Sequence, residues 1–451
     1  MIFMKKFYIT TAIPYVNGPP HIGHALEFIQ ADVVARYNRL LKKDVFFLTG
    51  ADEHGSKIVQ TAKDQKIGIK KLVDKNTKTF IDLHKALNIS YDNFIRTSDQ
   101  KKHWPVAQVF WKKLVEKGDI YKDKYRGLYC VGCEAFVAKK DLINGKCPEH
   151  NKKPELLQEE NYFFKLSKYI PEIKAKIKKQ ELKIIPKERE NEILSLLEQG
   201  TGDVSFSRPK KVLPWGIPVP EDDSHVIYVW CDALINYLSG DTKNFWPADV
   251  HVIGKGILRF HAAIWPGMLL AVGLPLPKTI LVHGYITSNG QKMSKSLGNV
   301  IDPSNLIKKH GTDAARYYLL REIPTTSDGD FSWERFEQRY NADLANDLGN
   351  LIKRSENLIK DIKIKNQEFK INPEIENFKF DKALDVIWKK IKWANQFIDK
   401  NKLWENKDKK KLAELKTAIY EIGLSLQPFI PETAQKIFKG DTDKPLFPRI
   451  K

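Results

Sequence analysis

Two histidines flank an isoleucine and a glycine near the start of the chain, in the segment His21-Ile22-Gly23-His24. The segment separates a strand-like run at 6–13 from a helical pattern that begins at Gly23, which places it at a helix N-terminus. Such a terminus attracts phosphate because its N–H groups are unpaired, and glycine lets a ligand approach the backbone. The imidazoles could donate hydrogen bonds to phosphate oxygens, and an ordinary structural turn is the alternative interpretation.

A second candidate for phosphate chemistry lies far along the chain, at Lys292-Met293-Ser294-Lys295-Ser296, directly after the Gly- and Ser-containing stretch 284–290. Two lysines on a movable loop can place positive charge on a triphosphate. Alone, such a loop is usually solvated surface, but together with the histidine segment it indicates a nucleotide site. The usual nucleotide signatures are missing, since the sequence has no Gly-x-x-x-x-Gly-Lys and Gly254-Lys255-Gly256 does not complete a dinucleotide motif.

A third constellation combines thiols and an imidazole in paired spacing, Cys130-x-x-Cys133 followed by Cys147-x-x-His150. This spacing is typical of a closed tetrahedral zinc site, and four protein ligands make the metal structural rather than catalytic. We therefore expect one structural Zn²⁺ per chain. A redox role for Cys-x-x-Cys is the weaker alternative. Cys231 stands apart, as a buried thiol or as part of a pocket wall.

Strands and helices that could position these groups follow in a recognisable order. A strand at 6–13, a helix and a second strand at 45–49 form a βαβ unit, which implies a parallel sheet. Residues 119–225 break the pattern, and the sheet resumes with strands predicted at His225–Trp230, Val250–Ile253 and Thr279–Val282. The last third is almost wholly helical, and we expect it to form a separate bundle. The prediction is an α/β fold of the Rossmann type with an insertion and a C-terminal helical bundle.

Charge and length limit the possible classes of protein. The chain has 451 residues, 75 basic against 56 acidic, with a formal charge of +19. This excess suits a polyanionic partner, although a lysine-rich genome would produce the same balance. The sequence has no apolar run long enough to span a membrane and no signal-peptide pattern, so we expect a cytoplasmic protein.

The paired histidine and lysine motifs closely resemble those of the class I aminoacyl-tRNA synthetases. Within that class, the segments 12–18, 50–55, 228–233 and 260–266 are similar to those of the methionyl-tRNA synthetases. The resemblance implies a methionine–tRNA ligase with His21, His24, Lys292 and Lys295 as catalytic residues and with Gly23 added for ATP binding. It implies that Asp52 holds the substrate ammonium. It also implies a methionine pocket formed by Ile13, Tyr15, Asp52, Trp230, Ala233, Leu234, Tyr237, Ile257, His261 and Trp265. From the residues alone, Trp230 and Trp265 would be core residues and Asp52 a surface turn residue.

The resemblance also gives the segments their roles. It implies two halves of the catalytic domain at 1–118 and 226–290, a connective insertion at 119–225 with a zinc knuckle at about 126–152, a lysine loop and stem-contact region at 291–337, and an anticodon-binding domain at 338–451. Asn350 and Arg354, on a helix expected at 343–360, and Trp404 would read the anticodon. Without the family, this face would be solvated and Trp404 would pack the bundle. Leu403 replaces the usual proline of the family.

The implied reaction has two steps, activation of methionine with ATP and transfer to the 3′ end of tRNA(Met), both elongator and initiator. Mg²⁺ should accompany ATP, and we expect a monomer. Three rival interpretations can be named. A synthetase for leucine, isoleucine or valine would need a larger editing insertion than 119–225 provides. A nucleotidyltransferase without tRNA chemistry would not need the helical third or the zinc segment. A homologue that only binds RNA would not need both motifs intact.

Overall fold

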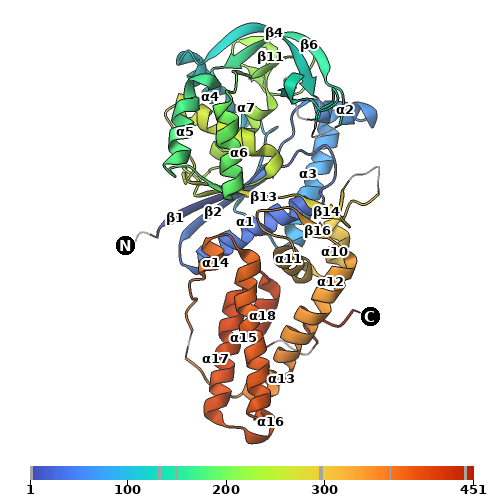
Figure 1. Ribbon diagram of the computed structural model, residues 1–451, viewed down its shortest axis with the longest axis vertical. Coiled ribbons are helices and arrows are strands. Elements are labelled where there is room, and N and C mark those ends of the chain that lie inside the picture. Colours follow the sequence, from blue (N-terminus) through green and yellow to red (C-terminus); the bar gives the residue numbers. More distant parts are fainter. Residues whose placement is uncertain are drawn as a thin grey trace.

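A six-stranded parallel sheet forms the centre of the computed structural model, which describes residues 4–130, 132, 135–137, 139–148, 151–293, 298–365, 367–440 and 444–450 (Figure 1). Every pair of neighbouring strands in it is parallel. In spatial order the strands are β3 (Asn93–Arg96), β2 (Asp44–Ala51), β1 (Lys6–Thr11), β12 (Val250–Gly254), β13 (Thr279–His283) and β7 (Lys183–Ile185). The predicted α/β fold with a parallel sheet is confirmed.

Both faces of this sheet are buried, and alternate residues of each strand point to opposite faces. Ile9 and Phe47 belong to a core shared with α1 (Ile22–Leu40) and α3 (Ile69–Ala86). Tyr8 and Phe46 belong to a second core on the other face, shared with α4 (Trp104–Glu116) and α9 (Trp265–Ala271). This double burial explains why the strands read as nearly continuous apolar runs in the sequence.

The order of the strands reverses between β1 and β12. From β1 the chain proceeds through α1 to β2 and then to β3 in one direction, whereas β12 is followed by β13 in the other. Such a reversal leaves a crevice at the carboxyl ends of the two central strands, where α/β sheets bind their ligands. β1, β2, β12 and β13 all end at this edge, and the segments that follow them begin there.

The range 119–225 contributes to three sheets. Outside the centre it forms an antiparallel sheet of β5 (Ala135–Val137), β4 (Ile120–Cys130), β6 (Glu155–Phe164) and β8 (Val204–Ser205). A smaller antiparallel sheet contains β10 (Pro218–Val219), β11 (Asp222–Ile227) and β9 (Ser207–Pro209). In the sequence, β7 lies after β6 and before β8, with α5 (Ile170–Lys178) before it and α6 (Lys187–Glu198) after it. It pairs with β13 at the edge of the central sheet.

The strand predicted at His225–Trp230 is wrong in its end and in its sheet. β11 stops at Ile227 and pairs with β9 and β10 rather than with the central strands. Trp230 lies instead on α7 (Val229–Leu234), a short helix with Asp232 in its first turn. The run Val226–Trp230 has strong strand propensity, but an acidic residue at a helix N-terminus and tertiary packing decide its second half.

After β13 the chain forms a hairpin of β14 (Ile286–Ser288) and β15 (Gln291–Lys292), with β16 (Gly329–Phe331) parallel to β14. Asn289 and Gly290 both have positive φ, as a tight two-residue hairpin turn requires. Two helices, α10 (Pro303–His310) and α11 (Thr312–Arg321), then lead away from the sheet. The hairpin thus carries Lys292 outward from the edge where the central strands end.

Helices make up the regular structure of the described residues after β16 (Figure 1). They are α12 (Trp333–Arg339), the π-helical η6 (Tyr340–Gly349), α13 (Asn350–Ile359), α14 (Pro373–Glu376), α15 (Phe380–Lys400), α16 (Leu403–Asn406), α17 (Lys409–Leu426) and α18 (Pro431–Lys439). Their apolar residues join the same buried cluster as α1, so the core continues from the sheet into the helices. No helix of the described residues is long and apolar enough to cross a membrane.

One buried arginine ties these parts together. Arg316 on α11 is fully buried and pairs with Asp32 of α1 at 2.8 Å. Its remaining donors reach the carbonyls of Leu87, after α3, and of Pro428 and Phe429, between α17 and α18. A buried guanidinium is stable only when its donors are satisfied, so this contact fixes α1 relative to the C-terminal helices.

Candidate active site

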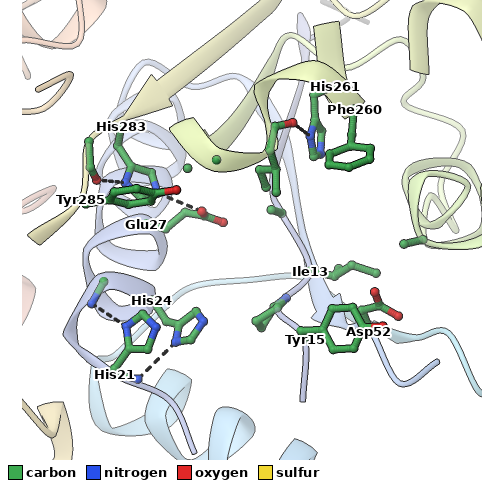
Figure 2. Close-up of a pocket in the computed structure, with 18 of the residues that line it drawn as sticks. Ile13, Tyr15, His21, His24, Glu27, Asp52, Phe260, His261, His283 and Tyr285 are labelled. Atoms are coloured by element: carbon green, nitrogen blue, oxygen red, sulfur yellow. Dashed lines mark hydrogen bonds and ion pairs between the residues drawn. The ribbon is translucent and has the colours of Figure 1, made fainter. Parts of the chain in front are cut away.

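A cavity of about 930 Å³ opens at the carboxyl ends of β1, β2, β12 and β13. Thirteen of the predicted site residues line it together: Ile13, Tyr15, His21, Gly23, His24, Asp52, Trp230, Ala233, Leu234, Tyr237, Ile257, His261 and Lys292. Figure 2 shows the two histidines of the N-terminal motif on one side of the cavity and Asp52 with Tyr15 on the other. The sequence pattern had placed these groups on separate segments, and the sheet brings them to one place.

His21 and His24 form a reciprocal cap at the N-terminus of α1. The Gly23 N–H donates to Nδ1 of His21, and the His21 N–H donates to Nδ1 of His24, both at 3.1 Å. Burial lowers the pKa of both rings, and the pKa of His24 lies well below its usual value because His21, His283 and His84 also oppose a further positive charge. In each neutral ring the proton therefore sits on Nε2, which leaves an N–H donor for a ligand.

Lys292, at the end of the β14–β15 hairpin, lines the same cavity. The hairpin is held by Asp330 of β16, which accepts hydrogen bonds from the Thr287 hydroxyl and the Gly290 N–H, each at 2.7 Å. Lys295, the second predicted lysine, lies outside the described residues. An anion between α1 and the hairpin would thus meet Nε2–H donors on one side and an ammonium on the other.

Asp52 is buried at the end of β2, which excludes the interpretation as a surface turn residue. Its backbone pairs with that of the segment after β1, since the Asp52 N–H donates to the Pro14 carbonyl and the Val16 N–H donates to the Asp52 carbonyl. The next residue, Glu53, is fully buried and accepts hydrogen bonds from Arg96 and from the hydroxyls of Thr77 and Ser98. The Asp52 carboxylate is therefore presented to the cavity by a rigid support.

His54 fixes the same loop from the other direction, through the buried carboxylate of Asp232. That carboxylate accepts one hydrogen bond from Nδ1–H of His54 and one from Nε2–H of His103, each at 2.6 Å. Burial alone would raise the pKa of Asp232, but the two imidazoles outweigh it and lower the pKa. Nδ1 of His103 in turn lies 2.7 Å from the Ser239 hydroxyl. The Asp232 cluster, formed by Asp232, His54 and His103, therefore joins the Asp52 loop, the start of α4 and α7.

The apolar wall of the cavity combines α7 with the π-helical turn η4 (Phe260–Ile264). The Trp230 ring stacks on Phe260 with centroids 3.6 Å apart. His261 donates from Nδ1 to the Ile257 carbonyl, so its Nε2 accepts the hydroxyl of Tyr237 at 2.7 Å. Burial lowers the pKa of His261 to about 4 and raises that of Tyr237. Their polar atoms are thus satisfied by each other, and the wall they present is neutral.

Known proteins match this chain over nearly its whole length. The family model described as "tRNA synthetases class I (M)" matches residues 7–153 and 137–356. Relatives named methionine–tRNA ligase are 42% identical in Caldanaerobacter subterraneus, over 96% of this chain and 74% of that protein, and 41% identical in Brucella melitensis, over 96% and 91%. The chain belongs to the methionyl-tRNA synthetases of class I. It is therefore an enzyme of the aminoacyl-tRNA synthetase type.

A solved structure supports the same assignment. The chain is similar to the Mycobacterium tuberculosis methionyl-tRNA synthetase in complex with methionyl-adenylate, with a TM-score of 0.89 and 37% identity over 96% of this chain and 93% of that one. The structure of the free state of the same protein gives a TM-score of 0.82 at 33% identity, over 99% of both chains. The arrangement of sheet and helices described above is thus that of a methionyl-tRNA synthetase.

Several cavity residues of this synthetase were missed by sequence reasoning. Glu27 lies one turn after His24 on α1 and pairs with Nε2 of His283 at 2.9 Å, while Nδ1 of His283 lies 2.8 Å from the Gly284 carbonyl (Figure 2). Both ring nitrogens of His283 thus face acceptors. The spacing from His24 and the position of His283 at the end of a strand were available signals. Phe260 and Tyr285 gave no local signal, because their roles depend on distant segments.

Trp265 and the cysteines have different surroundings from the cavity residues. Trp265 is fully buried, with its ring centroid 5.9 Å from that of Tyr237, and is not among the described residues that line the cavity. Cys130, Cys147 and Cys231 are buried thiols, and Cys231 has a raised pKa because it is buried. Cys133 and His150 lie outside the described residues. Among the described residues, no cluster of His, Cys, Asp and Glu is arranged to hold a metal ion.

The three predicted anticodon readers lie on the C-terminal helices. Asn350 is exposed at the start of α13, and Arg354 pairs with Asp399 of α15. Leu403 is fully buried while the Trp404 side chain is 47% exposed. Packing of this segment is therefore carried by Leu403, which leaves the ring of Trp404 available to a ligand and disfavours its interpretation as a packing residue.

Proposed function

We propose that this synthetase activates L-methionine with ATP to methionyl-adenylate and pyrophosphate, and then transfers methionine to the 3′ end of elongator and initiator tRNA(Met). The observation that carries the proposal is the opposition of two kinds of group across one cavity. Neutral Nε2–H donors at the N-terminus of α1 suit a triphosphate, and the buried carboxylate of Asp52 suits an ammonium. The adenylate bound by the Mycobacterium tuberculosis relative supports the same intermediate here.

In the first step the methionine carboxylate attacks the α-phosphorus of ATP in line and expels pyrophosphate. No protein nucleophile is needed, because positioning and charge stabilisation dominate phosphoryl transfer. His21 and His24 donate from Nε2 to the phosphate oxygens as charge develops, with the N-terminus of α1 behind them. Lys292, at the end of the hairpin, and Lys295, three residues later in the sequence, neutralise the departing pyrophosphate. Mg²⁺ travels with ATP and supplies further neutralisation of its phosphates.

Methionine lies between Asp52 and the apolar wall of the cavity. Its ammonium pairs with the Asp52 carboxylate, and its side chain extends toward Trp230, Tyr237 and His261. Because His261 is neutral and its Nε2 is occupied by Tyr237, the wall offers polarizable aromatic surface to the thioether, a contact of roughly 0.3–1.5 kcal/mol. Ile13, Tyr15, Ala233, Leu234 and Ile257 complete the pocket, and Trp265 supports it from behind.

In the second step a ribose hydroxyl of the terminal tRNA adenosine attacks the adenylate carbonyl and releases AMP. The C-terminal helices supply the second contact with tRNA. Asn350 and Arg354 have donors for base edges, and the exposed ring of Trp404 suits stacking of an unpaired base. A monomer in the cytoplasm is sufficient for this arrangement, because both contacts belong to one chain.

A structural zinc ion belongs to the insertion, held by Cys130, Cys133, Cys147 and His150. Cys130 and Cys147 are both buried, and the chain turns tightly around Cys147, whose N–H donates to Lys152 and whose carbonyl accepts from Asn151. A buried thiol beside a tight turn fits a zinc knuckle. The ion would fix the end of the insertion near the cavity, where Gly132 is a lining residue.

Amino-acid-dependent pyrophosphate exchange, measured for all twenty amino acids, tests the proposal. Methionine should be the only amino acid that supports rapid exchange, with slow activation of close analogues, since an apolar pocket discriminates one methylene by only about 1–3 kcal/mol. Faster exchange with leucine, isoleucine or valine than with methionine would show that the enzyme is specific for that amino acid instead. Rapid exchange with methionine but no charging of any tRNA would favour a nucleotidyltransferase, and no exchange at all would favour an RNA-binding homologue.

A further inference from the structure

A second cavity, of about 370 Å³, lies on the helical part of the molecule, between the η6–α13 junction and the segment Lys444–Ile450. It is lined by Ala345, Asn346, Gly349, Asn350, Ile352, Lys353, Lys444, Pro445, Leu446, Phe447 and Arg449. Asn350, one of the expected anticodon readers, is thus a wall of a defined cavity rather than an isolated residue on a helix face.

The segment Lys444–Ile450 is fixed against η6 by several contacts. The side-chain amide of Asn341 donates to the Ile450 carbonyl at 3.0 Å and accepts from the Ile450 N–H at 2.9 Å. Arg449 donates from Nε to Oδ1 of Asn346 at 2.9 Å. Phe447 is buried with its ring edge-on to Tyr340. The cavity is therefore preformed, which reduces the entropy lost when a ligand binds.

The charged residues that line this cavity in the described part of the chain are all basic. Lys353, Lys444 and Arg449 line it, and no aspartate or glutamate is among its described lining residues. Lys353 has one weak partner on its own helix, Glu356 at 3.5 Å. Arg449 uses only its Nε toward Asn346, so its two terminal amino groups can face a ligand. Three cations line the cavity with no carboxylate among its described lining residues, which favours an anion, and phosphate matches the planar guanidinium.

We propose that Lys444 and Arg449, together with Lys353, bind a phosphate of an unpaired tRNA nucleotide whose base is held by the amide of Asn350. The inference rests on the proposed tRNA substrate and assigns to the C-terminal segment a part in holding it. The cavity volume suits one nucleotide, and single-stranded RNA is recognised through splayed bases with phosphates on basic side chains. Gly349 keeps the wall beside Asn350 free of a side chain.

The test measures binding of a fluorescent RNA stem-loop with the methionine anticodon to the full-length enzyme over a range of salt concentrations. The double variant Lys444→Ala/Arg449→Ala is compared with Lys210→Ala/Lys211→Ala, which removes the same charge from exposed lysines next to β9, in the antiparallel insertion at the other end of the molecule (Figure 1). We expect the first variant to bind about tenfold more weakly and to lose roughly 0.7 per phosphate contact from the slope of log K against log salt. The control should match the wild type in both.

Other outcomes separate this inference from the proposed function. Equal affinities and salt slopes for the two double variants, with a wild type that prefers the methionine anticodon, would overturn the inference alone. A wild type with no preference between the methionine anticodon and a scrambled loop would instead count against the proposed function. Competition by millimolar inorganic phosphate as strong as that by the RNA would overturn the nucleotide assignment. Non-additive losses for Asn350→Ala and Arg449→Ala would support one shared pocket, and additive losses would oppose it.

Discussion

Replacing Asp232 tests whether the methionine site depends on a buried cluster behind it. The Asp232→Ala variant leaves two buried imidazole N–H groups without an acceptor, and each buried donor left unsatisfied costs about 1–3 kcal/mol of stability. The Asp52 loop and α7 lose their common anchor. If the ammonium of methionine thereby loses one charge-assisted hydrogen bond of about 1.5–3 kcal/mol, its affinity falls roughly 10- to 150-fold.

An asparagine at the same position should behave differently. His103 can move its ring proton to Nδ1 and donate to the Ser239 hydroxyl, which leaves Nε2 free to accept from the new amide. His54 then donates to the amide oxygen. Both rings keep a hydrogen-bond partner at position 232, so Asp232→Asn should bind methionine within about threefold of the wild type, a difference of less than about 0.7 kcal/mol.

Pyrophosphate-exchange kinetics with methionine and ATP varied separately provide the assay. The alanine variant should raise KM for methionine with little change in KM for ATP, because the side-chain hydrogen bonds of the Asp232 cluster in the described part of the chain join it to Ser239 and not to the histidine motif or the hairpin. His225→Leu is a matched control, since it removes a buried histidine bound to the Glu160 carbonyl outside the cavity. An equal rise in both KM values would refute the idea that Asp232 positions the methionine site. An asparagine variant as impaired as the alanine variant would refute it too.

The remaining predictions concern acid, zinc, tRNA and ATP. Burial holds the pKa of His84 and His261 at about 4 instead of 6.5. Because the pKa of each histidine is lower in the folded state than in the unfolded state, its contribution to the free energy of unfolding is fully present above pH 6.5. That contribution falls by about 3 kcal/mol per histidine as the pH is lowered to 4. His84→Gln should flatten the pH dependence of Tm, and an unchanged slope would contradict this. Metal analysis should find one zinc per chain, lost in Cys130→Ala; zinc-free protein prepared without chelator would oppose the site. Trp404→Ala should reduce tRNA charging about 5- to 150-fold, from stacking of roughly 1–3 kcal/mol, and much less with an altered anticodon; equal losses would indicate a packing role. Lys295→Ala should slow adenylate formation roughly 10²- to 10³-fold with little change in methionine affinity, and the reverse pattern would reject its role.

Local patterns in the sequence predicted the parts of the site that local physics determines. The histidine motif lies at a helix N-terminus because glycine, capping imidazoles and an apolar period occur within one short segment. Asp52 was predicted through family resemblance, whereas its surroundings alone suggested a surface turn. Its burial depends on Glu53 and His54, whose partners lie on other elements.

Contacts between distant segments could not be read from the sequence. His54 and His103 are 178 and 129 residues from Asp232 in the sequence. Nothing in the sequence around any of the three residues indicates that they are buried together. β7 is only three residues long and follows a helix within the supposed insertion, so its place in the central sheet comes from packing against β13. The stacking of Trp230 on Phe260 likewise requires the helix α7 that strand propensity had hidden.

The buried arginine on α11 limits how freely the parts of this enzyme can be exchanged. A chain cut before Pro428 would remove two of the four acceptors of Arg316, and the orphaned donors would destabilise the junction beneath α1. Grafting the helices of a relative onto this sheet would meet the same obstacle unless Asp32, Arg316 and the turn at Pro428–Phe429 were transplanted together. Chimaeras of the sheet and the helices should therefore take Asp32, Arg316 and the turn at Pro428–Phe429 from the same parent.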